Sequence, residues 1–103
     1  MLEKQIERYL REKVKKIGGV AYKFTSPQRR SVPDRLCLFK NGDVVFVEVK
    51  APGKKPTPNQ SREIQRLIDL GFKALVIDTR EKVDSLIEDV SNDKQDSCKP
   101  TQQ

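Results

Sequence analysis

Hydrophobic residues in the first half of the chain follow a helical repeat and then an extended one. Across residues 2–17 they recur every three or four positions, the spacing that lines up side chains on one face of a helix, at Leu2, Ile6, Tyr9, Leu10, Val14 and Ile17. The pair Gly18-Gly19 ends this pattern. Three shorter apolar runs follow, at 20–24, 35–39 and 44–49, and their length and their content of Val, Leu and Phe predict β-strands.

The second half alternates between helix and strand signals. Thr57 can cap a helix that has Pro58 at its first position and Gln60 at the third, and this helix should end before Gly71. The run 73–77 reads as a buried strand. Thr79 can then cap a last helix, which carries its apolar residues on one face at Val83, Leu86, Ile87 and Val90.

The resulting order is αβββαβα, which predicts an α/β fold with a mixed four-stranded sheet. A helix between the third and fourth strands allows these two to pair in parallel. The hairpin strands are apolar on both sides, so helices should cover both faces of the sheet. We expect one domain over residues 1–90 and a polar, disordered tail over residues 91–103, where the only apolar residue is Cys98.

Composition narrows the possible chemistry. The chain has 103 residues, 21 Lys and Arg against 15 Asp and Glu, and no histidine. A net charge of +6 favours a polyanionic partner. The absence of histidine excludes His-based acid–base catalysis, so any metal would need oxygen ligands and would be a hard cation such as Mg²⁺ or Mn²⁺. The two cysteines predict free thiols in a reducing compartment, with Cys37 in the core, and no apolar run approaches the ~18 residues of a membrane span. A cytoplasmic protein is the expectation, in a bacterial host cell if a phage encodes it.

The turn at Asn41-Gly42 decides which side chains meet across the predicted hairpin. A two-residue loop would place Asp34 and Glu48 on opposite faces of the sheet. A three-residue loop that includes Lys40, with Gly42 left-handed and a G1 bulge, pairs Asp34 with Glu48, their Cβ atoms roughly 5 Å apart. We predict the second register.

Two neighbouring carboxylates at the end of an apolar sheet repel each other, and neither gains from burial. A divalent cation held by Asp34, Glu48 and the Val49 carbonyl would resolve this conflict. Lys50 shares the face of Glu48 and is placed to orient a water or stabilise charge on a phosphodiester. Glu3 falls inside the apolar stripe of the first helix, which suggests a carboxylate facing this site, although fraying at the N-terminus is the simpler alternative.

The motifs "SVPDRLCLF" and "VVFVEVKAPGKKPTPNQ" resemble the PD-(D/E)XK nuclease superfamily, and within it the VRR-NUC family, whose small stand-alone members are often encoded by phages. The resemblance covers roughly residues 1–90 and implies a restriction-endonuclease-like core with a Mg²⁺ or Mn²⁺ site on Asp34 and Glu48. It implies Lys50 as the catalytic lysine, Glu3 as the acidic residue of the first helix and Gln60 as the family's glutamine, although a capping box also accounts for Gln60. Ser31 stands where the family often has glycine.

The resemblance further implies a homodimeric endonuclease acting on four-way junctions or other branched DNA. The open alternatives are a nicking or flap nuclease and a non-catalytic nucleic-acid-binding module. Basic residues cluster in the two loops beside the expected site, and this favours contact with DNA phosphates by Arg29, Arg30, Arg35, Lys54 and Lys55. Arg62 and Arg66 could extend that surface or belong to a solvated helix face.

Overall fold

A computed structural model describes residues 2–96, with side chains through residue 91. The elements are α1 (Glu3–Lys16), β1 (Val20–Lys23), β2 (Arg35–Leu38), β3 (Val44–Val49), α2 (Pro58–Asp69), β4 (Lys73–Ile77) and α3 (Arg80–Asp96). The four strands form one sheet in the order β1-β2-β3-β4. Neighbouring strands are antiparallel except for β3 and β4, which are parallel. The predicted order and the mixed sheet are therefore confirmed.

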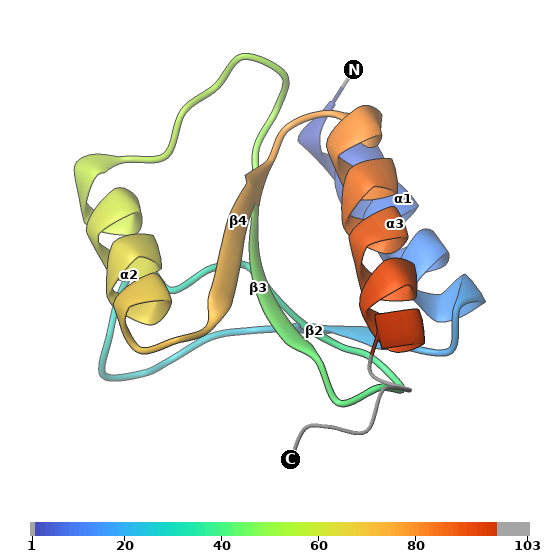
Figure 1. Cartoon of the computed structure of the whole chain (residues 1–103). Coiled ribbons are helices and arrows are strands. Elements are labelled where there is room, and N and C mark those ends of the chain that lie inside the picture. The colour runs from blue at the N-terminus through green and yellow to red at the C-terminus, as the bar shows by residue number, and fades with distance from the viewer. Residues whose placement is uncertain (1, 97–103) are drawn as a thin grey trace.

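Helices α1 and α3 lie side by side against one face of the sheet, and α2 lies on the other (Figure 1). Apolar side chains from α1, α3 and the inner face of β2, β3 and β4 form the core between them, among them Ile6, Leu10, Val47, Ile77 and Leu86. Cys37 belongs to this core and is fully buried, as expected. Helices on both faces are thus confirmed.

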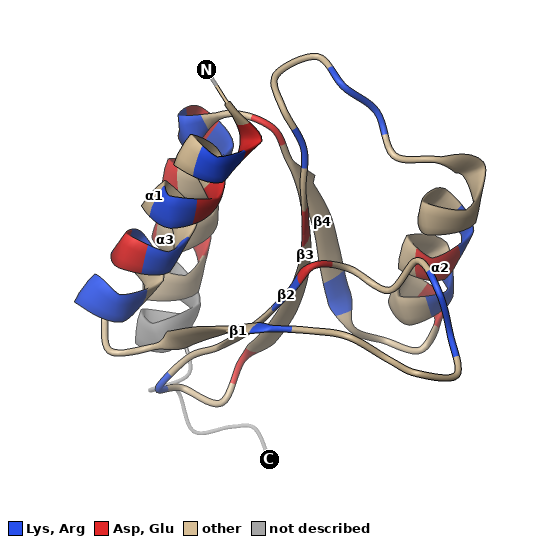
Figure 2. Ribbon diagram, turned by 180° about the vertical axis from the view of Figure 1, so that it is seen from behind, with Lys and Arg blue, Asp and Glu red and all other residues tan. Residues whose placement is uncertain are grey.

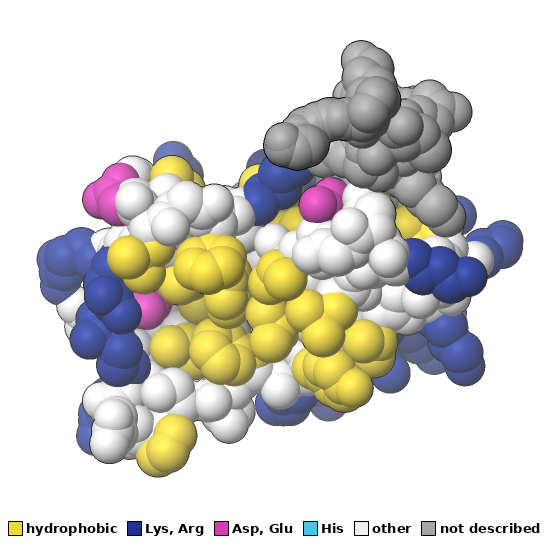
Figure 3. All heavy atoms as spheres, turned by 60° about the horizontal axis from the view of Figure 1, so that its bottom comes forward, with side chains coloured by type: hydrophobic (Ala, Val, Ile, Leu, Met, Phe, Trp, Pro, Cys, Tyr) yellow, Lys and Arg dark blue, Asp and Glu magenta, His cyan; other side chains and the backbone are white. Residues whose placement is uncertain are grey.

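Helix α2 covers only part of its face of the sheet, because it packs against β4, at one edge. Val20 and Tyr22 of β1 are 39% and 56% exposed on this side. At the end of α2, Ile68, Leu70 and Phe72 are 43–59% exposed. Figure 3 shows apolar side chains gathered into one patch on this side of the molecule. The strands are apolar on both faces, but on this face α2 covers only part of the apolar surface.

The last helix is longer than its apolar pattern indicates. It begins after Thr79, whose Oγ1 accepts a hydrogen bond from the Lys82 N–H at 3.2 Å, and this confirms the predicted cap. It continues to Asp96 rather than ending near Val90, where the apolar face ends. The segment 91–96 contains no proline or glycine to stop it. Part of the expected tail is therefore helical, and residues 97–103, including Cys98, lie outside the described part of the chain. None of the described helices combines the length and apolar content needed to cross a bilayer.

Candidate metal and nucleic-acid site

The turn between β2 and β3 has the predicted three-residue form. The Phe39 N–H donates to the Asp43 carbonyl at 3.0 Å, and the Gly42 N–H donates to the Phe39 carbonyl at 3.0 Å. Gly42 has a φ of +91°, the left-handed conformation that glycine adopts without strain. In this register Arg35 pairs with Val47, so the next positions along the strands place Asp34 opposite Glu48. The predicted alignment of the two carboxylate residues is confirmed.

Asp34 is fixed by the neighbouring strand. It is half-buried immediately before β2, and its Oδ2 accepts a hydrogen bond from the Val49 N–H at 3.1 Å. Its backbone carbonyl accepts from the Phe24 N–H at 2.8 Å, which extends the pairing with β1. The carboxylate is therefore held at the end of β3 by backbone contacts rather than by a flexible loop.

Glu48 is a buried carboxylate with an incomplete set of partners. Its residue is only 2% exposed. Its Oε2 accepts a hydrogen bond from Gln60 Nε2 at 3.1 Å and lies 3.5 Å from Lys50 Nζ. Its Oε1 is buried without a hydrogen-bond partner. Burial, and to a smaller extent the negative charge of Asp34, raise the pKa of Glu48 from 4.5 to about 7, with Lys50 acting in the opposite direction. A buried oxygen without a donor is costly, and a cation would relieve that cost.

Gln60 forms the expected capping box and also contacts Glu48. Its Oε1 accepts a hydrogen bond from the Thr57 N–H at 2.9 Å, and its own N–H donates to Thr57 Oγ1 at 3.1 Å, so the capping box is formed. The same side chain uses its Nε2 to hold Glu48. One amide therefore both begins α2 and links this helix to the end of β3.

Glu3 lies at the first turn of α1 and is exposed rather than turned into the core. Its position at the end of the helix explains this difference, because the apolar stripe packs on the sheet only from Ile6 onward. Its charge still contributes to raising the pKa of Glu48, as the smallest of the causes. Within the described part of the chain, no three Asp, Glu or Cys side chains gather closely enough to form a metal cage. Asp34 and Glu48 offer carboxylate oxygens as metal ligands, and such a pair fits a hard cation that keeps several waters.

The basic residues expected to contact DNA fall into two groups. Arg29, Arg30, Lys54 and Lys55 are exposed on the loops that precede β2 and follow β3 (Figure 2). Arg35 differs, because its side chain is only 13% exposed. Its Nε donates to Glu7 Oε2 at 2.8 Å and its Nη1 to the Ala21 carbonyl at 3.1 Å. Since Arg35 joins β2 to α1 and β1, we exclude it from the proposed DNA surface.

One interaction of the site escaped the sequence interpretation. Glu63 is buried on α2 and binds Arg29, 34 residues earlier in the chain. The sequence does contain an indication that Glu63 is buried, because it lies four residues before Leu67, on the apolar face of α2. Ser31 has a φ of +67°, a left-handed conformation that glycine adopts more easily. The loop therefore keeps the backbone shape of a glycine at a position occupied by serine.

Comparison with known proteins agrees with this geometry. The chain is 56% identical over 79 residues to "Putative nuclease p44" of Acyrthosiphon pisum secondary endosymbiont phage 1, a match that covers 77% of this chain and 85% of the relative. A solved structure described as "VRR_NUC domain" superposes with a TM-score of 0.79 at 34% identity and covers 84% of this chain and 94% of its own. No family model matches the sequence. On the strength of both likenesses, the chain belongs to the VRR-NUC family of nucleases.

Proposed function

We propose that this protein is a metal-dependent endonuclease that hydrolyses DNA phosphodiester bonds, with branched DNA such as a four-way junction as its substrate. The observation that carries this proposal is Glu48, a buried carboxylate with one oxygen lacking a partner, held in register beside Asp34. Among oxygen-ligand sites, this arrangement suits Mg²⁺ or Mn²⁺. A bound ion would supply a water of lowered pKa and a positive charge near the phosphate.

Each residue of the proposed site has a role that follows from its contacts. Asp34 and Glu48 would hold the ion, and the Val49 carbonyl would be a further ligand. Gln60 fixes Glu48 through Oε2, which leaves Oε1 available to the ion. Lys50, with its side chain 18% exposed, would hold the attacking water or stabilise the negative charge that develops on the phosphate. Glu3, at the rim, would contribute through the water shell.

A cleavage assay separates this proposal from a non-catalytic DNA-binding module. Labelled duplex, flap and four-way-junction DNA are incubated with Mg²⁺, Mn²⁺ or EDTA and with the wild-type, Asp34→Ala, Lys50→Ala or Asp89→Ala protein. Asp89 is exposed on α3, on the opposite side of the sheet, and serves as the matched control. We expect cleavage of the junction by the wild-type and Asp89→Ala proteins only, and only with metal.

The pattern of products decides among the alternatives. Binding of all substrates without any cut would refute the nuclease proposal, and so would cleavage that survives both Asp34→Ala and Lys50→Ala. Cleavage of the flap but not the junction would establish the flap-nuclease alternative. Cuts in only one strand of an intact duplex would establish a nicking enzyme.

We further propose that the active form is a homodimer, because one chain carries one site and two strands of a junction must be cut. The apolar patch formed by Val20, Tyr22, Ile68, Leu70 and Phe72 supports a second copy as the partner. In a two-fold dimer the same patch meets itself, so apolar surface is covered on both copies at once. Tyr22→Glu or Phe72→Glu should convert a dimer to a monomer in sedimentation. A wild-type protein that sediments as a monomer at all concentrations tested would refute this part of the proposal.

A further inference from the structure

A second basic site lies beside the one already described, between the loop that precedes β2 and helix α2. It is a cleft of about 360 Å³ that is lined by four arginines, Arg29, Arg30, Arg62 and Arg66. Water occupies roughly 30 Å³ per molecule in the liquid, so the cleft has room for a group much larger than one water. Among the described residues that line it, Glu63 alone is acidic, which leaves a formal excess of three positive charges.

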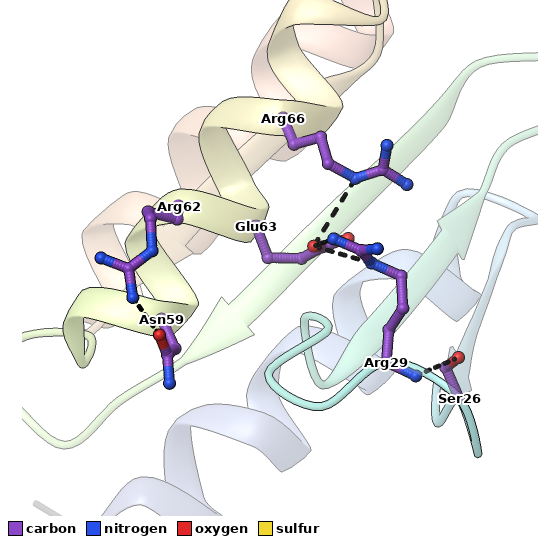
Figure 4. Close-up of polar contacts among 6 residues, drawn as sticks. All are labelled: Ser26, Arg29, Asn59, Arg62, Glu63 and Arg66. Atoms are coloured by element: carbon purple, nitrogen blue, oxygen red, sulfur yellow. Dashed lines mark hydrogen bonds and ion pairs between the residues drawn. The ribbon is translucent and has the colours of Figure 1, made fainter.

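Glu63 organises the arginines instead of opening to solvent. Its side chain is 8% exposed, and its Oε1 accepts hydrogen bonds from Arg29 Nε at 3.2 Å and Nη2 at 3.0 Å. Arg66 Nε approaches the same oxygen at 3.7 Å (Figure 4). Two guanidinium groups therefore converge on one buried carboxylate oxygen, one from the loop and one from the helix.

The two guanidinium groups keep capacity for another anion. The side chains of Arg29 and Arg66 are 52% and 50% exposed, so about half of each faces solvent. A guanidinium has five N–H donors, and Glu63 engages only part of them. Arg62 stands on the next turn of α2 and is held by Asn59 Oδ1. The arginines are thus held by contacts with Glu63 and Asn59, while part of each guanidinium group still faces solvent.

The cleft is joined to the proposed metal site through both of its walls. Glu63 follows Gln60, which binds Glu48, by three residues of α2, roughly 4.5 Å along the helix axis. Arg29 precedes Asp34 by five residues in the same loop. A polyanion that passes over Glu48 would therefore meet the arginines within a few nucleotides, since one strand of DNA carries a charge about every 3.4 Å.

We propose that this cleft binds backbone phosphates of DNA next to the phosphate that is cut, and that Glu63 is a positioning residue that holds Arg29 and Arg66 for this contact. The proposal rests on the proposed nuclease function for its choice of DNA as the ligand. Arginine pairs suit this task because their fork geometry matches phosphate oxygens. The cleft is a site for positioning the substrate and is separate from the chemistry at Glu48.

Binding of DNA without metal tests the cleft apart from cleavage. The affinity for a labelled 20-base-pair duplex is measured by fluorescence anisotropy in EDTA over a range of NaCl concentrations. The proteins are the wild type, Arg62→Gln, Arg66→Gln and the control Arg11→Gln. Arg11 is exposed on α1, across the sheet from the cleft, and its substitution changes the net charge by the same amount.

Each cleft variant should lower the slope of log affinity against log salt by about 0.9, the value of one lost phosphate contact. The affinity at 0.1 M salt should then fall on the order of tenfold. The control should keep the wild-type slope. If the cleft variants behave as the control does, the cleft proposal is wrong even where metal-dependent cleavage is found. A reduced slope in a protein that never cuts DNA would support the cleft and refute the nuclease.

Glu63→Gln tests the positioning role through the sign of the effect. The substitution adds one unit of positive charge, and so does Asp69→Asn at an exposed position of the same helix. If Glu63 only neutralised part of the positive charge, both variants would bind DNA as tightly as the wild type or more tightly. We expect Glu63→Gln to bind several-fold more weakly than Asp69→Asn, because Arg29 and Arg66 lose their shared anchor. Equal or tighter binding by a Glu63→Gln protein whose thermal unfolding is cooperative would overturn the positioning role.

Discussion

Replacement of Glu48 by glutamine should stabilise the metal-free protein and abolish its cleavage of DNA. Glutamine has the shape of the protonated carboxylic acid and can keep an acceptor toward Gln60 Nε2. It carries no charge into a position that is only 2% exposed. The negative charge of Glu48 destabilises the folded protein, and the proposed metal requires that same charge. Stability and activity should therefore change in opposite directions at this residue.

The size of the gain follows from the pKa of Glu48, which burial raises from 4.5 to about 7. Between these values the folded protein binds the proton more tightly than the unfolded chain does, so stability falls as the pH rises through this window. At 1.36 kcal/mol for each tenfold change in proton affinity, the loss from pH 4.5 to above pH 7 is about 3 kcal/mol. Glu48→Gln should be nearly neutral at pH 4 and should stabilise by up to about 3 kcal/mol at pH 8.

Urea unfolding of both proteins in EDTA, at half-unit steps from pH 4 to pH 8, measures this difference. Titration of every other group largely cancels in the comparison, since the two chains differ at one side chain. Added Mg²⁺ should stabilise the wild type by about 2.7 kcal/mol at a hundred times its dissociation constant and leave Glu48→Gln unchanged. A free-energy difference that stays flat between pH 4 and pH 8 would refute the burial argument. An equal response of both proteins to Mg²⁺ would refute the role of Glu48 as a ligand.

Three further substitutions test other contacts of the site. Gly42→Ala should destabilise the protein by about 1 kcal/mol in thermal or urea unfolding, because the left-handed φ of +91° is strained for alanine. The added Cβ would meet no atom within 4 Å beyond its chain neighbours, so the cost is conformational. Gly42→Asn should lose less stability, and equal losses by the two variants would contradict the conformational reason. Arg35→Gln breaks the partly buried ion pair with Glu7 and should cost about 1–3 kcal/mol of stability without altering the salt dependence of DNA binding; a reduced salt slope would return Arg35 to the DNA surface. Thr57→Ala removes the cap of α2 and should cost about 1 kcal/mol in urea unfolding. It should also lower cleavage, because the Gln60 backbone N–H loses its acceptor and the first turn of α2, which carries Gln60, is held less firmly; full activity would separate capping from the site.

Local signals along the chain were sufficient to predict much of this molecule. The helical repeat of α1, the cap at Thr57 and the strand lengths depend on neighbouring residues only, so they are readable in sequence. The register of β2 and β3 was also predictable, because an odd turn with glycine at its end fixes the pairing of every residue that follows. The opposition of Asp34 and Glu48 is a consequence of that turn.

Contacts between distant residues were not predictable in the same way. In the sequence, Arg35 is one more basic residue beside the expected site. Only the packing of α1 on the sheet shows that it forms an ion pair with Glu7. The pairing of Arg29 with Glu63 crosses between a loop and a helix whose relative positions no local pattern gives. The apolar face left open beside α2 is likewise a property of where that helix lies. Such features depend on three-dimensional placement, which periodicity does not encode.

The turn at 40–42 has a consequence for how this protein can change over evolution. Hairpin tips are ordinarily the places where chains gain or lose residues without harm. Here a single inserted or deleted residue would turn one strand over and carry Asp34 to the opposite side of the sheet from Glu48. Length variation at this tip should therefore be selected against as strongly as replacement of the carboxylates themselves. In this small fold a surface turn is therefore under the same constraint as the carboxylates of the proposed site.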